Sequence, residues 1–247
     1  MSEVTIHRNG AVLEITLARL DKKNALTGAM YRQLVVALDA AERDETIGAI
    51  LLKGDGGVFS AGNDIVDFVT GLDSGEEMPA AAFIRKLALN TTPIVAAVEG
   101  LAVGVGCTLL LHCDLIYAAP DARFSLPFVN LALVPEAGSS LLLPQRVGMA
   151  RASAWLLLGE PFGAQEALDA GLVNAVVPNQ ELLGVAREKA AVLAGKPRAA
   201  LAESRRLLRG DPKILLERME IELEAFAHAL KSIEARAALA SFLNKRK

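Results

Sequence analysis

The sequence predicts an α/β protein whose last quarter is entirely helical. Short apolar segments bounded by glycine or proline alternate with segments of helical periodicity as far as about residue 180, which is the pattern of an α/β core. Beyond Pro178 the chain is rich in Ala, Leu, Glu and Arg at helical spacing. The chain has 247 residues, of which 52% are hydrophobic and 22% charged, and this composition is typical of a compact globular protein.

The first two elements are a predicted hairpin and a predicted helix. Residues 4–17 contain Val and Ile in rough alternation around Asn9-Gly10, a dipeptide that suits the two positive-φ positions of a type I′ turn. Thr27 is a favourable N-cap residue. The helix that it would begin has an apolar stripe made of Met30, Leu34, Leu38 and Ala41.

Buried strands are predicted for the short apolar segments that follow. Glycines bound residues 48–54, and residues 94–98 read IVAAV. A glycine-rich turn and a helix over residues 105–113 come next, and residues 115–119 and 123–126 predict two further strands.

The C-terminal helices are predicted over residues 179–195, 198–209 and 212–240. Lys196-Pro197 and Gly210-Asp211-Pro212 separate them, since proline interrupts a helix. We therefore divide the chain into an α/β core (1–195) and a helical region (196–247). The polar, glycine-containing segment 70–79 is the best candidate for a mobile loop.

Composition and charge narrow the class of protein. The net charge is only −3, which gives no reason to expect nucleic acid as a partner. Cys107 and Cys113 lie in an apolar segment without other potential metal ligands at suitable spacing, and we interpret them as buried packing residues in a reducing compartment. The sequence has neither an apolar run of roughly 18 residues nor a signal-peptide pattern, so we expect a cytoplasmic protein without a membrane partner.

Two glycine-containing turns carry the first chemical hint. Residues 56–65 read GGVFSAGNDI and residues 98–114 read VEGLAVGVGCTLLLHCD, each directly after a predicted strand. Glycine allows close approach of a ligand, and the start of a helix presents unpaired N–H groups. Two such turns side by side could form an oxyanion hole. Tight turns without any catalytic role explain the same pattern equally well.

The order of several motifs resembles one family along nearly the whole chain. The motifs are LARLDKKNALTGAM, FSAGNDI, PIVAAVEGLAVGVGC, CDLIYAAPDARFSLP and DAGLVNAVVP, and they resemble the enoyl-CoA hydratase/isomerase (crotonase) superfamily. The resemblance implies a crotonase-like spiral of β-β-α units with a C-terminal helical trimerisation region. It also implies an acyl-CoA thioester substrate, assembly as a homotrimer or dimer of trimers, and no separate cofactor or metal, because coenzyme A is part of the substrate.

The same resemblance assigns the oxyanion hole and shows where this sequence differs from the hydratases of the family. Asn63 matches the first amide donor and Val105 the second, where most members have glycine. The two glutamates that hydratases use would fall at Thr108 and Phe128. Neither side chain exchanges a proton usefully at neutral pH, which argues against efficient addition of water to a double bond.

Glu136, in LVPEAGSS, is the predicted catalytic residue. Members of the family that act as Δ3,Δ2-enoyl-CoA isomerases place a catalytic carboxylate at this position. The neighbouring apolar residues are expected to desolvate Glu136, and desolvation makes a carboxylate a better base. A surface or helix-cap glutamate is the structural alternative.

Binding residues follow from the resemblance alone. It places residues 22–25 and 61–65 around the adenine and pantetheine, so Lys22, Ala25, Ala61, Asp64 and Ile65 are candidates, with Phe242 and Lys245 near a phosphate. Thr108 and Phe128 are also predicted to contact substrate, and Phe128 and the loop 70–79 to line the acyl pocket. The Asp64 and Asp114 carboxylates are interpreted as structural.

Several alternatives remain open. Glu136 could serve slow hydration or thioester hydrolysis on the same fold, or the protein could be a non-catalytic acyl-CoA-binding scaffold. A serine hydrolase lacks its G-x-S-x-G motif, and position 109 is Leu where a dinucleotide fingerprint needs glycine. His112 is interpreted as a satisfied core histidine. Arg205, Arg206 and Arg209 are interpreted as solvated or at a subunit contact.

Overall fold

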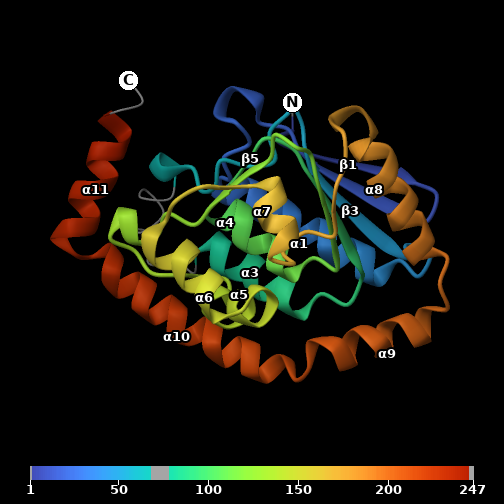
Figure 1. The fold of residues 1–247 in the computed structure, drawn as a ribbon. Helices are drawn as coiled ribbons and strands as arrows, with labels where there is room; N and C mark the ends of the chain where they lie inside the picture. The colour runs from blue at the N-terminus through green and yellow to red at the C-terminus, as the bar shows by residue number, and fades with distance from the viewer. Residues whose placement is uncertain (1, 68–77, 245–247) are drawn as a thin grey trace.

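A twisted six-stranded sheet forms the centre of the molecule (Figure 1). The computed structural model describes residues 2–67 and 78–244, without the side chains of 242–244. The predicted loop at 70–79, apart from its last two residues, lies outside this description, as do Lys245 and the side chain of Phe242. The strand order is β1-β2-β3-β4-β6-β9. Only β1 and β2 are antiparallel, and the other neighbours are parallel. The strands are β1 (Val4–Asn9), β2 (Val12–Leu17), β3 (Ala49–Gly54), β4 (Ile94–Val98), β6 (Leu115–Ala118) and β9 (Ala175–Val176).

A second, three-stranded sheet is built from β5 (Leu101–Val103), β7 (Arg123–Ser125) and β8 (Phe162–Gly163). β5 follows β4 after a two-residue turn, so the chain passes directly from one sheet into the other. β5 pairs parallel with β7, and β7 pairs antiparallel with β8. This passage brings the segment after β5 to the edge where the candidate site forms.

Helices cover both faces of the large sheet. α1 (Gly28–Arg43) and α3 (Pro79–Leu89) pack on the main core, which includes Ile50 and Leu52 of β3. On the opposite face α8 (Asn179–Ala194) packs against Leu51 and its neighbours. Because alternate residues of β3 enter the two cores, its first four residues, 49–52, are apolar and buried, as expected for a parallel strand covered on both faces.

The remaining helical elements connect the sheets and enclose the site. They are η1 (Leu20–Lys22), α4 (Val105–Thr108), η3 (Leu109–His112), η4 (Val129–Leu131), α5 (Ser139–Val147), α6 (Met149–Ser153), the π-helix η5 (Ala154–Leu158) and α7 (Ala164–Asp169). The C-terminal helices α9 (Arg198–Arg209), α10 (Pro212–Leu230) and α11 (Ile233–Asn244) wrap around one side of the core (Figure 1). The division into 1–195 and 196–247 stays a prediction.

Three local predictions need correction. The hairpin forms, but Asn9 pairs with Val12 and only Gly10 has positive φ, so the turn centres on Gly10 and Ala11. The predicted helix over 105–113 is α for one turn and then 3₁₀, and Arg146 donates to the Leu110 and Cys113 carbonyls where it ends.

The third correction concerns the last predicted helix, over 212–240. It is broken between α10 and α11, where the Ser232 hydroxyl accepts a hydrogen bond from the Ala235 amide at 3.0 Å and so caps a new helix. Within the described part of the chain, no helix is long and apolar enough to cross a membrane.

Candidate active site

The two glycine-containing turns predicted from the sequence lie side by side. Ser60 connects them: its amide donates to the Leu101 carbonyl at 2.8 Å, and its carbonyl accepts from the Val103 amide at 3.0 Å. A methyl group added at Gly62 would lie 2.7 Å from the Val103 carbonyl oxygen, and one at Gly106 would lie 2.9 Å from the Ser60 Cβ. The close approach of the turns therefore requires glycine at both positions.

The predicted oxyanion donors, Asn63 and Val105, lie next to the contacting glycines in the two turns. Leu26 pairs with the two neighbours of Asn63, donating to Gly62 and accepting from Asp64, so the Asn63 N–H points to the other side of the segment. Val105 is the first residue of α4, and the N–H groups of the first turn of a helix have no acceptor within that helix. Both amides are thus available at adjoining turns.

Glu136 lies in an irregular segment between η4 and α5. The two residues after it, Ala137 and Gly138, have φ values of 59° and 71°, so the chain reverses sharply just before α5. Left-handed backbone is costly for alanine. His112 helps to hold the turn, because its Nε2–H donates to the Ala137 carbonyl at 2.8 Å.

The Glu136 carboxylate is desolvated and has no cation beside it in the described structure. Burial is the main cause that raises its pKa from 4.5 to about 7. The Thr108 hydroxyl donates to Oε1 at 2.5 Å and lowers the pKa. The negative charge of Glu222 raises it. A carboxylate with such a pKa is well matched to proton transfer near neutral pH.

Tyr31 and Asn63 form a second polar group at the site. The Tyr31 hydroxyl donates to the Asn63 side-chain oxygen. Burial, with smaller effects from Glu136 and Asp67, raises the pKa of Tyr31 well above its ordinary value. Tyr31 is therefore a neutral donor that orients the Asn63 side chain, and it is not a proton acceptor.

A small cavity of about 50 Å³ connects Glu136 and Asn63 with an apolar wall between α3 and α10. An apolar cavity with a few convergent polar groups is the usual form of a small-molecule site. Phe128 does not line this cavity and is buried in the main core; its place in an acyl pocket stays a prediction. The apolar wall consists of Met78, Ala80, Ala81, Ile84, Ala137, Met219, Leu223 and Phe226.

The predicted CoA-binding segments, 22–25 and 61–65, are neighbours in the structure. The Ala61 amide donates to the Lys23 carbonyl at 2.9 Å. Lys22 is exposed at the end of η1, Ala25 is buried and Ile65 packs against the main core. Asp64 forms an ion pair with Arg19 at 2.7 Å. Burial raises the pKa of Asp64, but the hydrogen bond from Arg19 outweighs this effect together with smaller contributions, and the pKa is lowered. The carboxylate therefore has a structural role.

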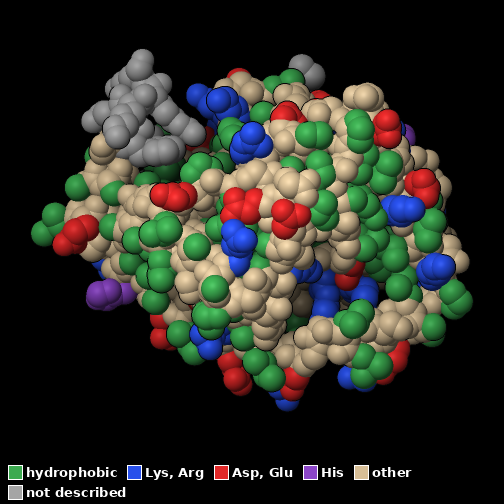
Figure 2. All heavy atoms as spheres, viewed as in Figure 1, with side chains coloured by type: hydrophobic (Ala, Val, Ile, Leu, Met, Phe, Trp, Pro, Cys, Tyr) green, Lys and Arg blue, Asp and Glu red, His purple; other side chains and the backbone are tan. Residues whose placement is uncertain are grey.

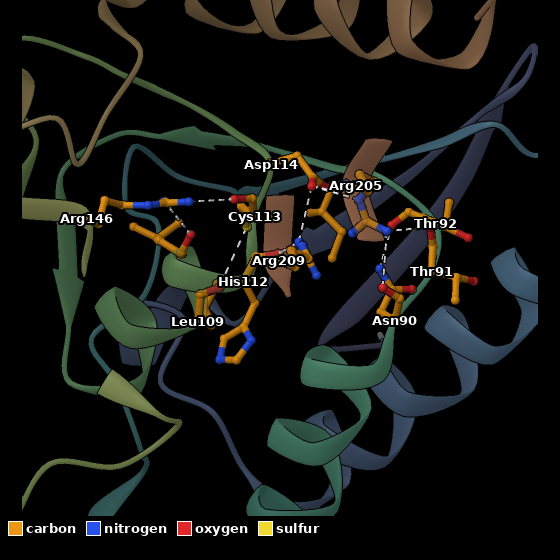
Figure 3. Close-up of polar contacts among 12 residues, drawn as sticks. Asn90, Thr91, Thr92, Leu109, His112, Cys113, Asp114, Arg146, Arg205 and Arg209 are labelled. Carbon is orange, nitrogen blue, oxygen red and sulfur yellow. Dashed lines mark hydrogen bonds and ion pairs between the residues drawn. The ribbon is translucent and has the colours of Figure 1, made fainter. Parts of the chain in front are cut away.

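Two of the chemically suggestive side chains turn out to be structural, as interpreted from the sequence. His112 is buried and bonded to the Ala137 carbonyl, and burial lowers its pKa to about 4. Asp114 accepts the Ile94 amide at 2.8 Å and pairs with Arg205 and Arg209 (Figure 3). Cys107 and Cys113 are buried and unpaired.

The interpretation of the arginine cluster as solvated or at a subunit contact was wrong for Arg205. Arg205 is only 7% exposed, and it binds Asp114 at 2.7 Å and the Thr91 carbonyl at 2.5 Å. Arg209 binds Asp114 and the His112 carbonyl. Arg206 and Arg209 are both exposed, and Arg206 forms an ion pair with Glu203. Figure 2 shows basic side chains at the bottom of a hollow beside α9, which matches a cavity of about 810 Å³ that these arginines line.

Sequence reasoning missed Tyr31, Glu222 and the wall formed by α3 and α10. A signal for Glu222 existed, because it interrupts the buried stripe of α10, which otherwise contains Met219, Phe226 and Leu230. A charged residue in an apolar helical stripe needs a buried partner. Tyr31 offered no such signal, since it reads as an ordinary core residue of α1.

Comparison with known proteins identifies the class to which this fold and site belong. The model of the enoyl-CoA hydratase/isomerase family matches residues 7–247, and the chain belongs to this family. The solved structure of an enoyl-CoA hydratase/isomerase from Pseudoalteromonas atlantica T6c is 38% identical, with a TM-score of 0.94 over 100% of this chain and 98% of that one. The predicted crotonase-like α/β fold is thereby confirmed.

Particular relatives differ in their named reactions. The chain is 34% identical to the 2,3-dehydroadipyl-CoA hydratase of Escherichia coli K12 and 33% identical to its 1,2-epoxyphenylacetyl-CoA isomerase, each covering 100% of this chain and 97% of the relative. It is also 34% identical to enoyl-CoA delta isomerase 2 of Rattus norvegicus, covering 85% of this chain and 55% of the relative. The chain is thus an enzyme of acyl-CoA metabolism from a family that includes both hydratases and isomerases.

Proposed function

We propose that the protein is a Δ3,Δ2-enoyl-CoA isomerase in which Glu136 carries the proton. The observation that carries this proposal is the desolvated Glu136 carboxylate on the cavity, with a pKa of about 7 and no cation beside it in the described structure. The residues at the two hydratase positions are Thr108, which bonds Glu136, and Phe128, which is part of the core. Neither supplies a second acid or base.

The proposed reaction begins with the thioester oxygen at the Asn63 and Val105 amides. Glu136 removes a proton from C2 of a 3-enoyl-CoA, and the electron pair spreads into a dienolate whose negative oxygen accepts the two N–H groups. The protonated Glu136 then returns the same proton to C4, so the double bond moves from C3–C4 to C2–C3. One carboxyl suffices because it acts as base and acid in succession.

Hydration is the alternative, because Glu222 brings a second carboxylate to the cavity. Both of its oxygens already accept backbone amides, from Gly138 at 2.6 Å and Ser140 at 2.9 Å. Activation of water would require Glu222 to give up one of these bonds. The occupied state of Glu222 therefore favours the one-carboxylate reaction.

For coenzyme A, we propose contacts with the adjoining segments 22–25 and 61–65, and with Phe242 and Lys245. We also propose assembly as a trimer or dimer of trimers through the C-terminal helices, where Leu208 is 88% exposed and Ile233 is 84% exposed. Light scattering after size exclusion measures the assembly. A monomer at micromolar concentration contradicts this part of the proposal.

The decisive assay compares trans-3-hexenoyl-CoA with crotonyl-CoA, each followed by the absorbance of the conjugated thioester. We expect absorbance to appear with the first substrate and to persist with the second. Rapid loss of crotonyl-CoA absorbance, without reaction of the 3-enoyl substrate, would instead identify a hydratase. No reaction with either, despite binding, would favour a non-catalytic acyl-CoA-binding protein.

A further inference from the structure

Glu222 connects the C-terminal helix α10 to the segment that carries Glu136. Its carboxylate is buried, with the residue only 6% exposed, and it accepts the Gly138 amide at 2.6 Å and the Ser140 amide at 2.9 Å. These donors lie more than 80 positions earlier in the chain. The first turn of α5 has no capping side chain of its own at Gly138, so Glu222 caps the helix from outside.

The capped turn is the one that aims the catalytic carboxyl. Ala137 and Gly138 both have left-handed backbone, and a conformation of this kind persists only where its surroundings enforce it. His112 donates a hydrogen bond to the Ala137 carbonyl, and Glu222 accepts hydrogen bonds from the Gly138 and Ser140 amides. Without Glu222, these amides would be buried without acceptors, and the turn could relax.

Glu222 also lines the same cavity as Glu136. Its charge adds to the burial that raises the pKa of Glu136. The other groups that face Glu136 are the Thr108 hydroxyl and Cys107 of α4 and the Tyr31 hydroxyl of α1. Glu222 is thus the one neighbouring carboxylate among the described groups that act on Glu136.

We propose that Glu222 is the positioning residue for Glu136: it caps α5 and fixes the Ala137–Gly138 turn, and its negative charge strengthens Glu136 as a base. The inference rests on the proposed role of Glu136 as the proton carrier. It assigns to α10 an indirect part in the chemistry. Glu222 acts through Glu136 alone.

The test compares Glu222→Gln with Glu224→Gln, an exposed residue on the same helix. In Glu222→Gln one amide loses its acceptor and the charge disappears. We expect the plateau kcat to fall roughly tenfold and the rising limb of kcat/KM against pH to move down by about half a pH unit. Glu224→Gln should match the wild type. An unchanged limb would overturn the electrostatic part, and an unchanged plateau would overturn the positioning part.

A direct titration separates this inference from the proposed reaction. The ¹³C signal of the Glu136 carboxyl, identified by its loss in Glu136→Gln, should titrate at lower pH in Glu222→Gln whatever reaction the enzyme catalyses. If the wild type fails to isomerise 3-enoyl-CoA but this shift occurs, only the proposed function fails. If isomerisation occurs without the shift, only the inference fails.

A second variant covers the possibility that Glu222→Gln does not fold. Glu222→Asp keeps the charge but withdraws it by one methylene, so the amide bonds weaken. The plateau kcat should fall while the pH limb stays nearly in place. A wild-type plateau in Glu222→Asp would overturn the positioning role.

Discussion

Asp114 and Glu136 are two carboxylates held within the same protein, and their surroundings are opposite. Asp114 lies between two guanidinium groups, at 2.7 Å from Arg205 and 3.2 Å from Arg209, and also accepts the Ile94 amide (Figure 3). Glu136 receives one hydroxyl hydrogen bond, from Thr108, and faces the like charge of Glu222. The charge of Asp114 is therefore fully paired, whereas the surroundings of Glu136 favour its protonated form.

The difference explains why one carboxylate holds the fold together and the other can do chemistry. A buried charge that is paired and fully hydrogen-bonded is inert, and removing its partner is strongly destabilising. A buried charge without a cation has a shifted pKa and readily exchanges its proton. The fold therefore gives up some stability at Glu136 in order to keep a base there.

The largest expected effect is the loss of turnover in Glu136→Gln. The amide has the same shape but cannot accept a proton, so we expect the rate to fall by about 10³-fold or more. Acyl-CoA affinity, measured by calorimetry, should change little. Retention of turnover would show that Glu136, like Asp114, has no catalytic role, and the proposed difference between the two carboxylates would be wrong.

The next effect is on stability and concerns Asp114→Ala. Loss of this carboxylate leaves the buried Arg205 without its ionic partner, so the free energy of unfolding should fall by about 3 kcal/mol. Urea denaturation followed by circular dichroism measures it. Glu203→Ala, which breaks the exposed pair with Arg206 on the same helix, is the control and should leave the midpoint unchanged. Equal midpoints for both variants would contradict the structural role of Asp114.

The pH dependence of stability distinguishes the two carboxylates further. The folded pKa of Glu136 is about 7 against an ordinary value of 4.5, so the folded state binds the proton more tightly. The wild type should therefore lose stability relative to Glu136→Gln as pH rises from about 4.5 to about 7, by up to about 3 kcal/mol. Melting temperatures at pH 5 and pH 8 test this, and a constant difference between the two proteins would contradict it.

The sequence predicted most of the fold because its signals were local. Apolar runs between glycines and helical stripes correctly indicated β3, β4, α1, α8 and α9. Two errors were local: the hairpin turn centres on Gly10 and Ala11, and the Ser232 hydroxyl caps a new helix inside the predicted 212–240. The third involves a distant side chain, because Arg146 donates to carbonyls at the end of η3, and no property of residues 105–113 alone indicates this.

The candidate site was predictable in part for the same reason. The motif resemblance selected Glu136, Asn63 and Val105, and the apolar neighbours of Glu136 correctly predicted its desolvation, but the polar groups that face it were not predicted. Arg205 and Asp114 are 91 positions apart, and Glu222 and Gly138 are 84 apart. Such pairs depend on how α9 and α10 fold back on the core. A charged residue within a buried stripe indicates that a partner exists, but not which one.

The smallest expected effect sharpens the comparison by removing the Thr108 hydroxyl, which stabilises the Glu136 anion. In Thr108→Val the side chain keeps its shape and loses its hydroxyl, so the pKa of Glu136 should rise further. The rising limb of kcat/KM against pH should move to higher pH, and the rate at pH 7 should fall several-fold. Thr108→Ser keeps the hydroxyl and should retain the wild-type limb. If both variants titrate like the wild type, Thr108 does not act on the Glu136 anion, and burial and Glu222 alone set its proton affinity.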